Sequence, residues 1–306
     1  IVGIFGAHPD IDPKLFPAFT GFSVATKNGV LFLFPILFTT VACGAISGFH
    51  SLVSSGTTSK QLDKEKDAKP IAYGGMLLEC VLAVITLCAV AYARSTGHTA
   101  GVTDIFAGGI AAMVAQIPGL AGMEKAFYTL LVLAYSTFCL TSLDTATRLA
   151  RFMFQEFFLE PGQTPKDIKD GWKKFMVNPY FATILTVILG ILLGMNGFQK
   201  IWGLFGAANQ LLAGIGLLAV ATWLGNAGRN NKMFLFPMAF MMVVTLSSLV
   251  IIVKNQLHII SAGAADWGPY AQAGIGILLI ALAVVLAVEG CQTIAAQRRK
   301  KAEAAD

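Results

Sequence analysis

The chain has 306 residues, of which 56% are hydrophobic and only 13% are charged, and its mean hydropathy is +0.69. A water-soluble domain of this length would carry far more charge, so the composition excludes a soluble fold and indicates an all-α polytopic membrane protein. The net charge of +5 does not indicate nucleic-acid binding, because the basic residues form short clusters between apolar runs, as in loops that set membrane orientation.

Membrane spans are expected where apolar runs reach about 20 residues. Residues 1–28 lack such a run and are expected to form an external loop, and residues 295–306 are expected to form a solvated cytoplasmic tail. The segment 102–120 is too short and too rich in glycine to span, which predicts an external hairpin or a short surface helix. We predict a single domain with about seven transmembrane helices: 30–56, which is interrupted, 71–93, 126–157, 179–196, 203–225, 232–253 and 271–294.

The first span becomes small and polar while it is still at membrane depth. Its three glycines, Gly44, Gly48 and Gly56, lower helix propensity, and its many hydroxyls compete with the backbone hydrogen bonds. Backbone groups that leave the helix survive in a bilayer only where protein or water surrounds them. The stretch therefore predicts a broken helix of the kind that binds solute in secondary transporters. The alternative is close helix packing through the GxxxG that Gly44 and Gly48 form.

Polar residues in and near this helix are the candidates for contact with a small-molecule solute. His50 could contact an anion as a charged ring, or equally act as a neutral donor to a neighbouring helix. Two adjacent amides in the fifth span could bridge helices as readily as they could contact solute. The substrate-binding candidates are Ser47, Gly48, His50, Ser54, Asn209 and Gln210.

A second polar group lies in the third span. Thr137, Thr141, Asp144, Thr145 and Arg148 recur three and four residues apart, so they form one stripe on a helix. Hydroxyl and carboxylate oxygens suit a hard cation such as Na⁺, and a carboxylate within the membrane can also carry a proton. The alternative is an ion pair of Asp144 with Arg148 that has no role in transport. The ion-coupling candidates are Thr141, Ser142, Asp144, Thr145 and Glu79, with Thr141, Ser142 and Thr145 as ligands for Na⁺.

Other chemistry finds no support in the sequence. The five cysteines fall in apolar runs and form no CxxC, which is typical of small buried side chains. The chain contains no HExxH, GxxxxGK[ST] or GxSxG motif, so we expect no enzyme activity and no cofactor other than a coupling ion, Na⁺ or H⁺.

The basic residues predict the orientation. If every span crosses once, sixteen of the 22 Lys and Arg share one side, which the positive-inside rule assigns to the cytoplasm together with the C-terminus. These are Lys60, Lys64, Lys66, Lys69, Arg148, Arg151, Lys166, Lys169, Lys173, Lys174, Arg229, Lys232, Arg298, Arg299, Lys300 and Lys301.

Four stretches of the chain resemble the carbon starvation protein CstA family: CGAISGFHSLVSSGTTSKQL, DAKPIAYGGMLLE, LTSLDTATRLARFMFQE and WGLFGAANQLLA. The resemblance covers most of the chain, from about residue 35 to about residue 225. It implies a carrier in the bacterial inner membrane that responds to the stress of carbon starvation. Such a carrier would take up pyruvate or peptides by symport with protons or sodium.

The CstA family is in turn similar to the amino acid/polyamine/organocation superfamily, whose LeuT-like fold has two inverted five-helix repeats and extra helices. On that template the interrupted span resembles the sixth helix, the Asp144 stripe lies on the eighth, and 102–120 forms the external lid between the seventh and eighth. The chain would then be the second half of the fold, and Ile1, with no initiator Met before it, the start of a fragment. The missing N-terminal helices would come from the same protein or from a partner chain, within membrane lipid. The rival hypothesis is a noncatalytic helix-packing subunit or sensor of a larger membrane complex.

Overall fold

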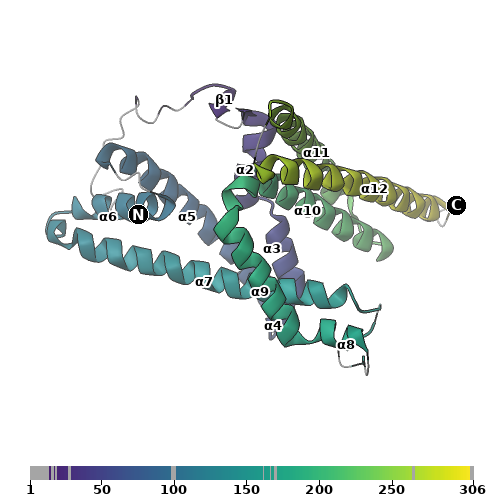
Figure 1. Ribbon diagram of the computed structural model, residues 1–306. Helices are drawn as coiled ribbons and strands as arrows, with labels where there is room; N and C mark the ends of the chain where they lie inside the picture. The colour runs from purple at the N-terminus through teal and green to yellow at the C-terminus, as the bar shows by residue number, and fades with distance from the viewer. Residues whose placement is uncertain are drawn as a thin grey trace. The chain divides into compact units, whose positions relative to one another are not determined.

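The computed structural model describes residues 14, 17, 19–26, 29–97, 101–160, 162–165, 167–168, 171–263 and 266–303. Almost all of its regular structure is helical (Figure 1), which confirms the all-α prediction. The chain divides into two compact units, which we describe one at a time. Unit 1 comprises residues 1–20 and 58–153, and unit 2 comprises residues 21–57 and 154–306.

Unit 2 begins with a β-hairpin that we did not predict. Strand β1 (Ser23–Thr26) pairs antiparallel with β2 (Gly29–Phe32). The expected external loop at 1–28 lies partly outside the described residues, and its end belongs to β1. The first span accordingly starts at Leu33 and not at residue 30. The dipeptide Asn28-Gly29 is common in turns and could have predicted a turn before this start.

The first span consists of short helical pieces on either side of an interruption. Residue Ser47 is extended, with φ −132° and ψ 130°, and separates the two sides. Beyond it the helix passes through Gly56 in a π-helical turn without a second interruption. The pieces are η1 (Leu33–Leu37), α2 (Phe38–Val41) and η2 (Ala42–Gly44) before Ser47, and α3 (Gly48–Val53), η3 (Ser54–Thr58) and α4 (Ser59–Gln61) after it.

The rest of unit 2 is built on three long helices that pack side by side (Figure 1), α10 (Phe198–Asn226), α11 (Lys232–Ser261) and α12 (Trp267–Glu303). Their common core contains Leu204, Leu211, Met242, Leu249 and Ala283. Helices α2 and α3 both lie against α10, so the interruption faces the middle of that helix. The remaining helices of this unit are α8 (Trp172–Val177) and α9 (Pro179–Asn196).

Unit 1 holds η4 (Glu65–Asp67), α5 (Ala68–Thr96), α6 (Val102–Ala115), η5 (Ala121–Met123) and most of α7 (Glu124–Glu156). Helix α5 ends at Gly97, whose φ of +84° suits a residue without a Cβ. Helix α6 packs along α5 so closely that a Cβ on Gly109 would lie 2.4 Å from the carbonyl oxygen of Ala89. The segment 102–120, expected as a hairpin or a short surface helix, is one helix followed by a turn.

Six helical segments of the described chain are long and apolar enough to cross a membrane: Leu33–Gln61, Glu65–Arg94, Ala121–Glu156, Ile201–Asn226, Lys232–Ser261 and Trp267–Gln297. The remaining one of the seven expected spans, 179–196, corresponds to α9, which is apolar but has only 18 residues. At about 1.5 Å per residue it reaches about 27 Å, slightly less than the hydrocarbon thickness of about 30 Å.

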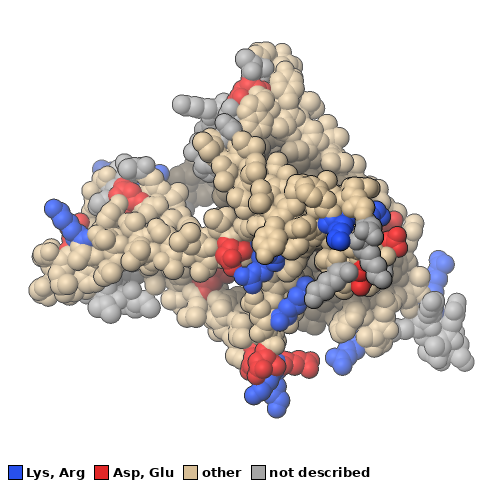
Figure 2. Space-filling view, turned by 60° about the horizontal axis from the view of Figure 1, so that its bottom comes forward, with Lys and Arg blue, Asp and Glu red and all other residues tan. Residues whose placement is uncertain are grey.

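The surface agrees with a membrane environment. Figure 2 shows a face formed mainly by uncharged residues, with Lys, Arg, Asp and Glu confined to a few small groups. Helix α12 continues to Glu303, so most of the expected tail at 295–306 is helical, and residues 304–306 lie outside the described chain.

Candidate functional site

The interruption of the first span brings three of the predicted solute residues together: Ser47, Gly48 and Asn209. Ser47 is the N-cap of α3, and its Oγ accepts a hydrogen bond from the backbone N–H of His50 at 3.4 Å. Serine is favoured at this position because its side chain replaces a carbonyl that the helix lacks. The first turn of α3 is thus supported although the helix before it has ended.

Asn209 reaches the same turn from α10. Its Oδ1 accepts a hydrogen bond from the backbone N–H of Phe49 at 2.7 Å. Its Nδ2 donates to Cys43 Sγ at 3.2 Å and to Ser47 Oγ at 3.3 Å. The side chain is 7% exposed, and both ends of its amide are occupied within the protein. Of the two explanations left open for this residue, the structure therefore favours the bridging of helices.

The two glycines of the GxxxG sequence differ. A Cβ on Gly48 would lie 2.3 Å from the Asn209 carbonyl oxygen and 2.6 Å from Leu212 Cβ, so only glycine lets α3 approach α10 this closely. Around Gly44, by contrast, a Cβ would meet no atom within 4 Å. The alternative of close packing therefore applies to Gly48 and not to Gly44, which is the last residue of η2.

The other predicted solute residues lie in different surroundings. The side chains of His50 and Ser54 are exposed on α3 and η3, on the part of the span that follows the interruption. Gln210 is fully buried on α10, and neither its Nε2 nor its Oε1 has a hydrogen-bond partner. An unpaired amide in such a place is costly, and it is not accessible to a solute.

The predicted ion stripe lies on α7, in unit 1. The hydroxyl of Thr141 donates to the Phe138 carbonyl at 2.8 Å, and that of Thr145 donates to the Thr141 carbonyl at 3.1 Å. Asp144 Oδ2 lies 2.9 Å from Arg148 Nη2, with the two side chains 69% and 40% exposed. The structure thus forms the ion pair that was the alternative hypothesis, and as donors both hydroxyls still have lone pairs that can accept.

Glu79, the fifth ion-coupling candidate, is exposed on α5. Ser142, the third proposed ligand for Na⁺, is half-buried on α7. Within the described residues, His, Cys, Asp and Glu side chains form no group of three or more that could hold a metal ion. A cation at the stripe would therefore depend on hydroxyl oxygens, backbone carbonyls and the single carboxylate of Asp144.

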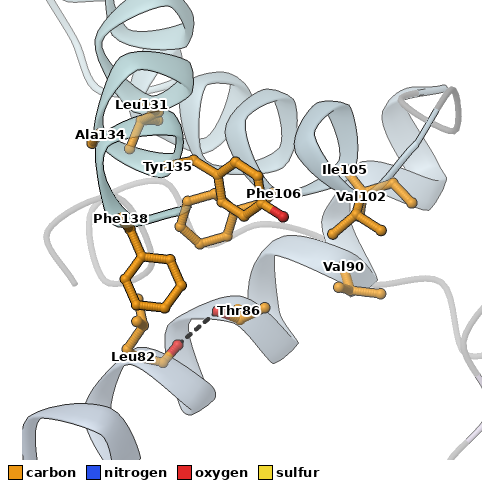
Figure 3. A pocket seen from close by; sticks show the side chains of 10 residues that line it. All are labelled: Leu82, Thr86, Val90, Val102, Ile105, Phe106, Leu131, Ala134, Tyr135 and Phe138. Atoms are coloured by element: carbon orange, nitrogen blue, oxygen red, sulfur yellow. Dashed lines mark hydrogen bonds between the residues drawn. The ribbon is translucent and has the colours of Figure 1, made fainter. Parts of the chain in front are cut away.

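A cavity of about 520 Å³ lies in unit 1, where α5, α6 and α7 meet (Figure 3). The rings of Phe106 and Tyr135 face each other at its centre, with their centroids 6.2 Å apart. The hydroxyl of Thr86 donates to the Leu82 carbonyl at 2.8 Å, so it is committed within α5 (Figure 3). The walls offer no cationic group for a carboxylate, and none of the predicted site residues lines this cavity. We could not have predicted it, because three separate helices form it.

The fold and the interrupted helix together define the chain as a polytopic α-helical membrane protein with a broken span. Comparison with known families gives its particular relationship. The model of the family described as carbon starvation protein CstA matches residues 1–100 and 92–248, which is more than half of the chain. The chain belongs to the CstA family.

Named relatives agree with this assignment. The peptide transporter CstA of Bacillus subtilis (strain 168) is 31% identical over 285 residues, which cover 79% of this chain and 46% of the relative. The peptide transporter CstA of Escherichia coli (strain K12) is 32% identical over 279 residues, covering 71% and 39%. The pyruvate/proton symporter BtsT of the same strain is 28% identical over 295 residues, covering 71% and 40%. The chain thus spans less than half the length of these relatives. No solved structure matches it.

Proposed function

We propose that this chain forms part of a secondary active transporter that imports small carboxylates, with pyruvate as the first candidate and short peptides as the second. It would work by ion-coupled alternating access and not by enzymatic catalysis. The names of the relatives support transport of one of these two solutes. The whole transporter would include further helices N-terminal to this chain, which spans less than half the length of its relatives.

One observation carries the proposal: the helix break at Ser47 within a span of bilayer length. Backbone that leaves the helical conformation is tolerated at membrane depth where it is buried in protein or lines a wet cavity. Asn209 satisfies part of this backbone, while His50 and Ser54 stay exposed on the same span. We propose that the exposed side chains of His50 and Ser54, together with the half-buried Ser47, contact the solute.

The coupling ion, H⁺ or Na⁺, would act at the stripe on α7. This helix belongs to the span Ala121–Glu156, and none of the residues in the apolar 18-residue stretch of that span is buried within the chain. A carboxylate such as Asp144 is unfavourable in contact with lipid, so this face would be covered by further polypeptide or by a wet cavity. Helices supplied by the same protein or by a partner chain would provide that cover.

The transporter would lie in the bacterial inner membrane with the C-terminus in the cytoplasm, as the distribution of basic residues indicates. Fusing a reporter that is active only in the cytoplasm after the last residue tests the orientation. Activity of this reporter is expected, and an inactive fusion that is stably produced would reverse the assignment.

Uptake into proteoliposomes tests the proposed activity. The purified full-length transporter is reconstituted, and accumulation of labelled pyruvate or a labelled dipeptide is followed under an inward proton gradient and, separately, an inward sodium gradient. We expect accumulation of at least one solute under one gradient, and its collapse when an ionophore dissipates that gradient. No uptake of either solute under either gradient would reject the proposal.

A second candidate, a helix-packing subunit or sensor, is favoured by the committed hydrogen bonds of Asn209, Thr141 and Thr145. Such a protein would bind a solute without moving it. Specific binding of pyruvate in detergent, together with no uptake in the proteoliposomes, would support this candidate over a carrier.

A further inference from the structure

The two arms of the broken span share one side chain, that of Asn209. Cys43 lies before the interruption and Phe49 lies after it, and the Asn209 amide bonds both, 3.2 Å from the thiol and 2.7 Å from the backbone nitrogen. The orientation of the amide follows from chemistry. The N–H of Phe49 can donate only to the oxygen end, so the nitrogen end must face Cys43.

The two bonds that Asn209 makes across the break are of unequal strength. The C-terminal arm, α3, is locked against α10 at Gly48, which leaves no room for a Cβ. It also touches α10 at Gly216, where a Cβ would lie 2.7 Å from Ser51 Oγ, an atom that can rotate away. The bond from Phe49 to Asn209 adds a third attachment.

The N-terminal arm packs on both α10 and α11, with Thr39 and Ala42 buried, but its bond to Asn209 is the weaker of the two. Its link to Asn209 ends on Cys43 Sγ, and a thiol is a weak acceptor. A Cβ on Gly206 of α10 would meet Thr40 of α2 only at 3.6 Å, which is ordinary contact. Gly44 is surrounded by open space. If the break changes its angle, the bond to Cys43 is therefore the one that opens.

We infer that Asn209 is a positioning residue that fixes the angle of the break, and that its amide releases Cys43 while it keeps Phe49 when the N-terminal arm turns about residues 45–47. This inference rests on the proposed function, in which the broken span works in alternating access. It gives the neighbouring amides different roles: Asn209 holds the break, and Gln210 does not.

Reaction of Cys43 with a maleimide tests the inference without any solute or ion gradient. Cys43 is half-buried, so its alkylation rate reports opening of the arm. The other four cysteines of this chain, and any cysteine in the rest of the full-length transporter, are replaced by alanine. We expect Asn209→Ala to raise the alkylation rate several-fold and Gln210→Ala, the adjacent control, to leave it unchanged. A protein with Cys88 of α5 as its sole cysteine should react equally fast with and without Asn209→Ala. Equal rates in all variants, or the same increase with Gln210→Ala, would overturn the inference.

A second measurement leaves the Asn209 side chain in place. Cys43→Ala removes the weak acceptor of Asn209 and the thiol contact with Ser47 Oγ, and it leaves the bond between Phe49 and Asn209. Backbone amide exchange is then expected to speed up at residues 42–46 and to stay slow at residues 48–53. Unchanged exchange at 42–46, or a uniform increase across both arms, would refute the unequal strength of the two Asn209 bonds. If Asn209→Ala raises the alkylation rate but no uptake is found, the positioning role of Asn209 stands and the transport proposal fails. If uptake occurs and the alkylation rate does not change, only the positioning role fails.

Discussion

The side-chain carbonyl of Asn209 accepts a hydrogen bond from the backbone N–H of Phe49 at 2.7 Å, across an interval of 160 residues in the sequence. Phe49 is the second residue of α3, so its N–H has no carbonyl partner within the helix. In a bilayer no water replaces that partner, and another helix has to supply it. This one contact explains how a helix can end and begin again inside an apolar span.

The tight approach of α3 to α10 leads to a prediction about Gly48. Gly48→Ala places a Cβ 2.3 Å from the backbone oxygen of Asn209, so α3 must move away from α10. Overpacking of this kind costs about 1–3 kcal/mol. Thermal unfolding in detergent should show a lower Tm. The control is Gly44→Ala, which meets no atom and should leave Tm unchanged or slightly higher. An equal loss for both variants would contradict the unequal packing.

Replacing Gln210 is expected to raise stability, whereas Gly48→Ala is expected to lower it. Its amide is fully buried without a hydrogen-bond partner, so replacing it with the similarly sized, apolar Met removes a desolvation penalty of about 1–3 kcal/mol. Gln210→Met should therefore raise the free energy of unfolding, measured by chemical denaturation in detergent. Asn209→Leu, the control with a paired amide, should lower it. A loss of stability in Gln210→Met would show that this amide has a partner in the membrane.

These neighbouring amides show what the sequence could and could not predict. Consecutive helical residues point about 100° apart, so one amide faces the broken span and the other is buried in the helix bundle. The sequence placed both in the middle of a span but did not contain the rotation of α10 about its own axis. That rotation follows from packing against α11 and α12, whose contacts are far away in the chain.

Local patterns, in contrast, were sufficient for several features. Glycines and hydroxyls in an apolar run predicted a broken first span, and the break lies at Ser47. The spacing of Asp144 and Arg148 made their ion pair a foreseeable alternative, because residues four apart are neighbours on a helix. The different packing of Gly44 and Gly48 could not be foreseen, since it depends on Leu212 and Asn209 of a distant helix.

Gln155 connects two helix ends that the sequence did not associate. It is 4% exposed near the end of α7, and its Nε2 donates to the carbonyl oxygen of Val177, the last residue of α8, at 2.7 Å. Gln155→Leu keeps most of the volume but leaves that carbonyl without this donor, which should cost about 1–3 kcal/mol in unfolding free energy. Gln163→Leu, at an exposed glutamine in the following loop, is the control and should change stability by less than about 0.5 kcal/mol. Equal effects of the two substitutions on the denaturation midpoint would argue against a structural role for Gln155.

Asp144 separates a role in coupling from a role in folding. Its ion pair with Arg148 is largely exposed within the chain, and exposed pairs contribute only about 0.2–1 kcal/mol. Asp144→Asn should therefore leave Tm nearly unchanged, yet it removes the negative charge that would bind Na⁺ or carry a proton, so gradient-driven uptake should be lost. Arg148→Gln is the matched control, because it breaks the same ion pair and keeps the carboxylate, and uptake should persist. Both variants are compared in proteoliposomes under the gradient that supports the wild-type protein. Full uptake by Asp144→Asn would exclude this carboxylate from coupling, and equal loss in both variants would assign the effect to the ion pair.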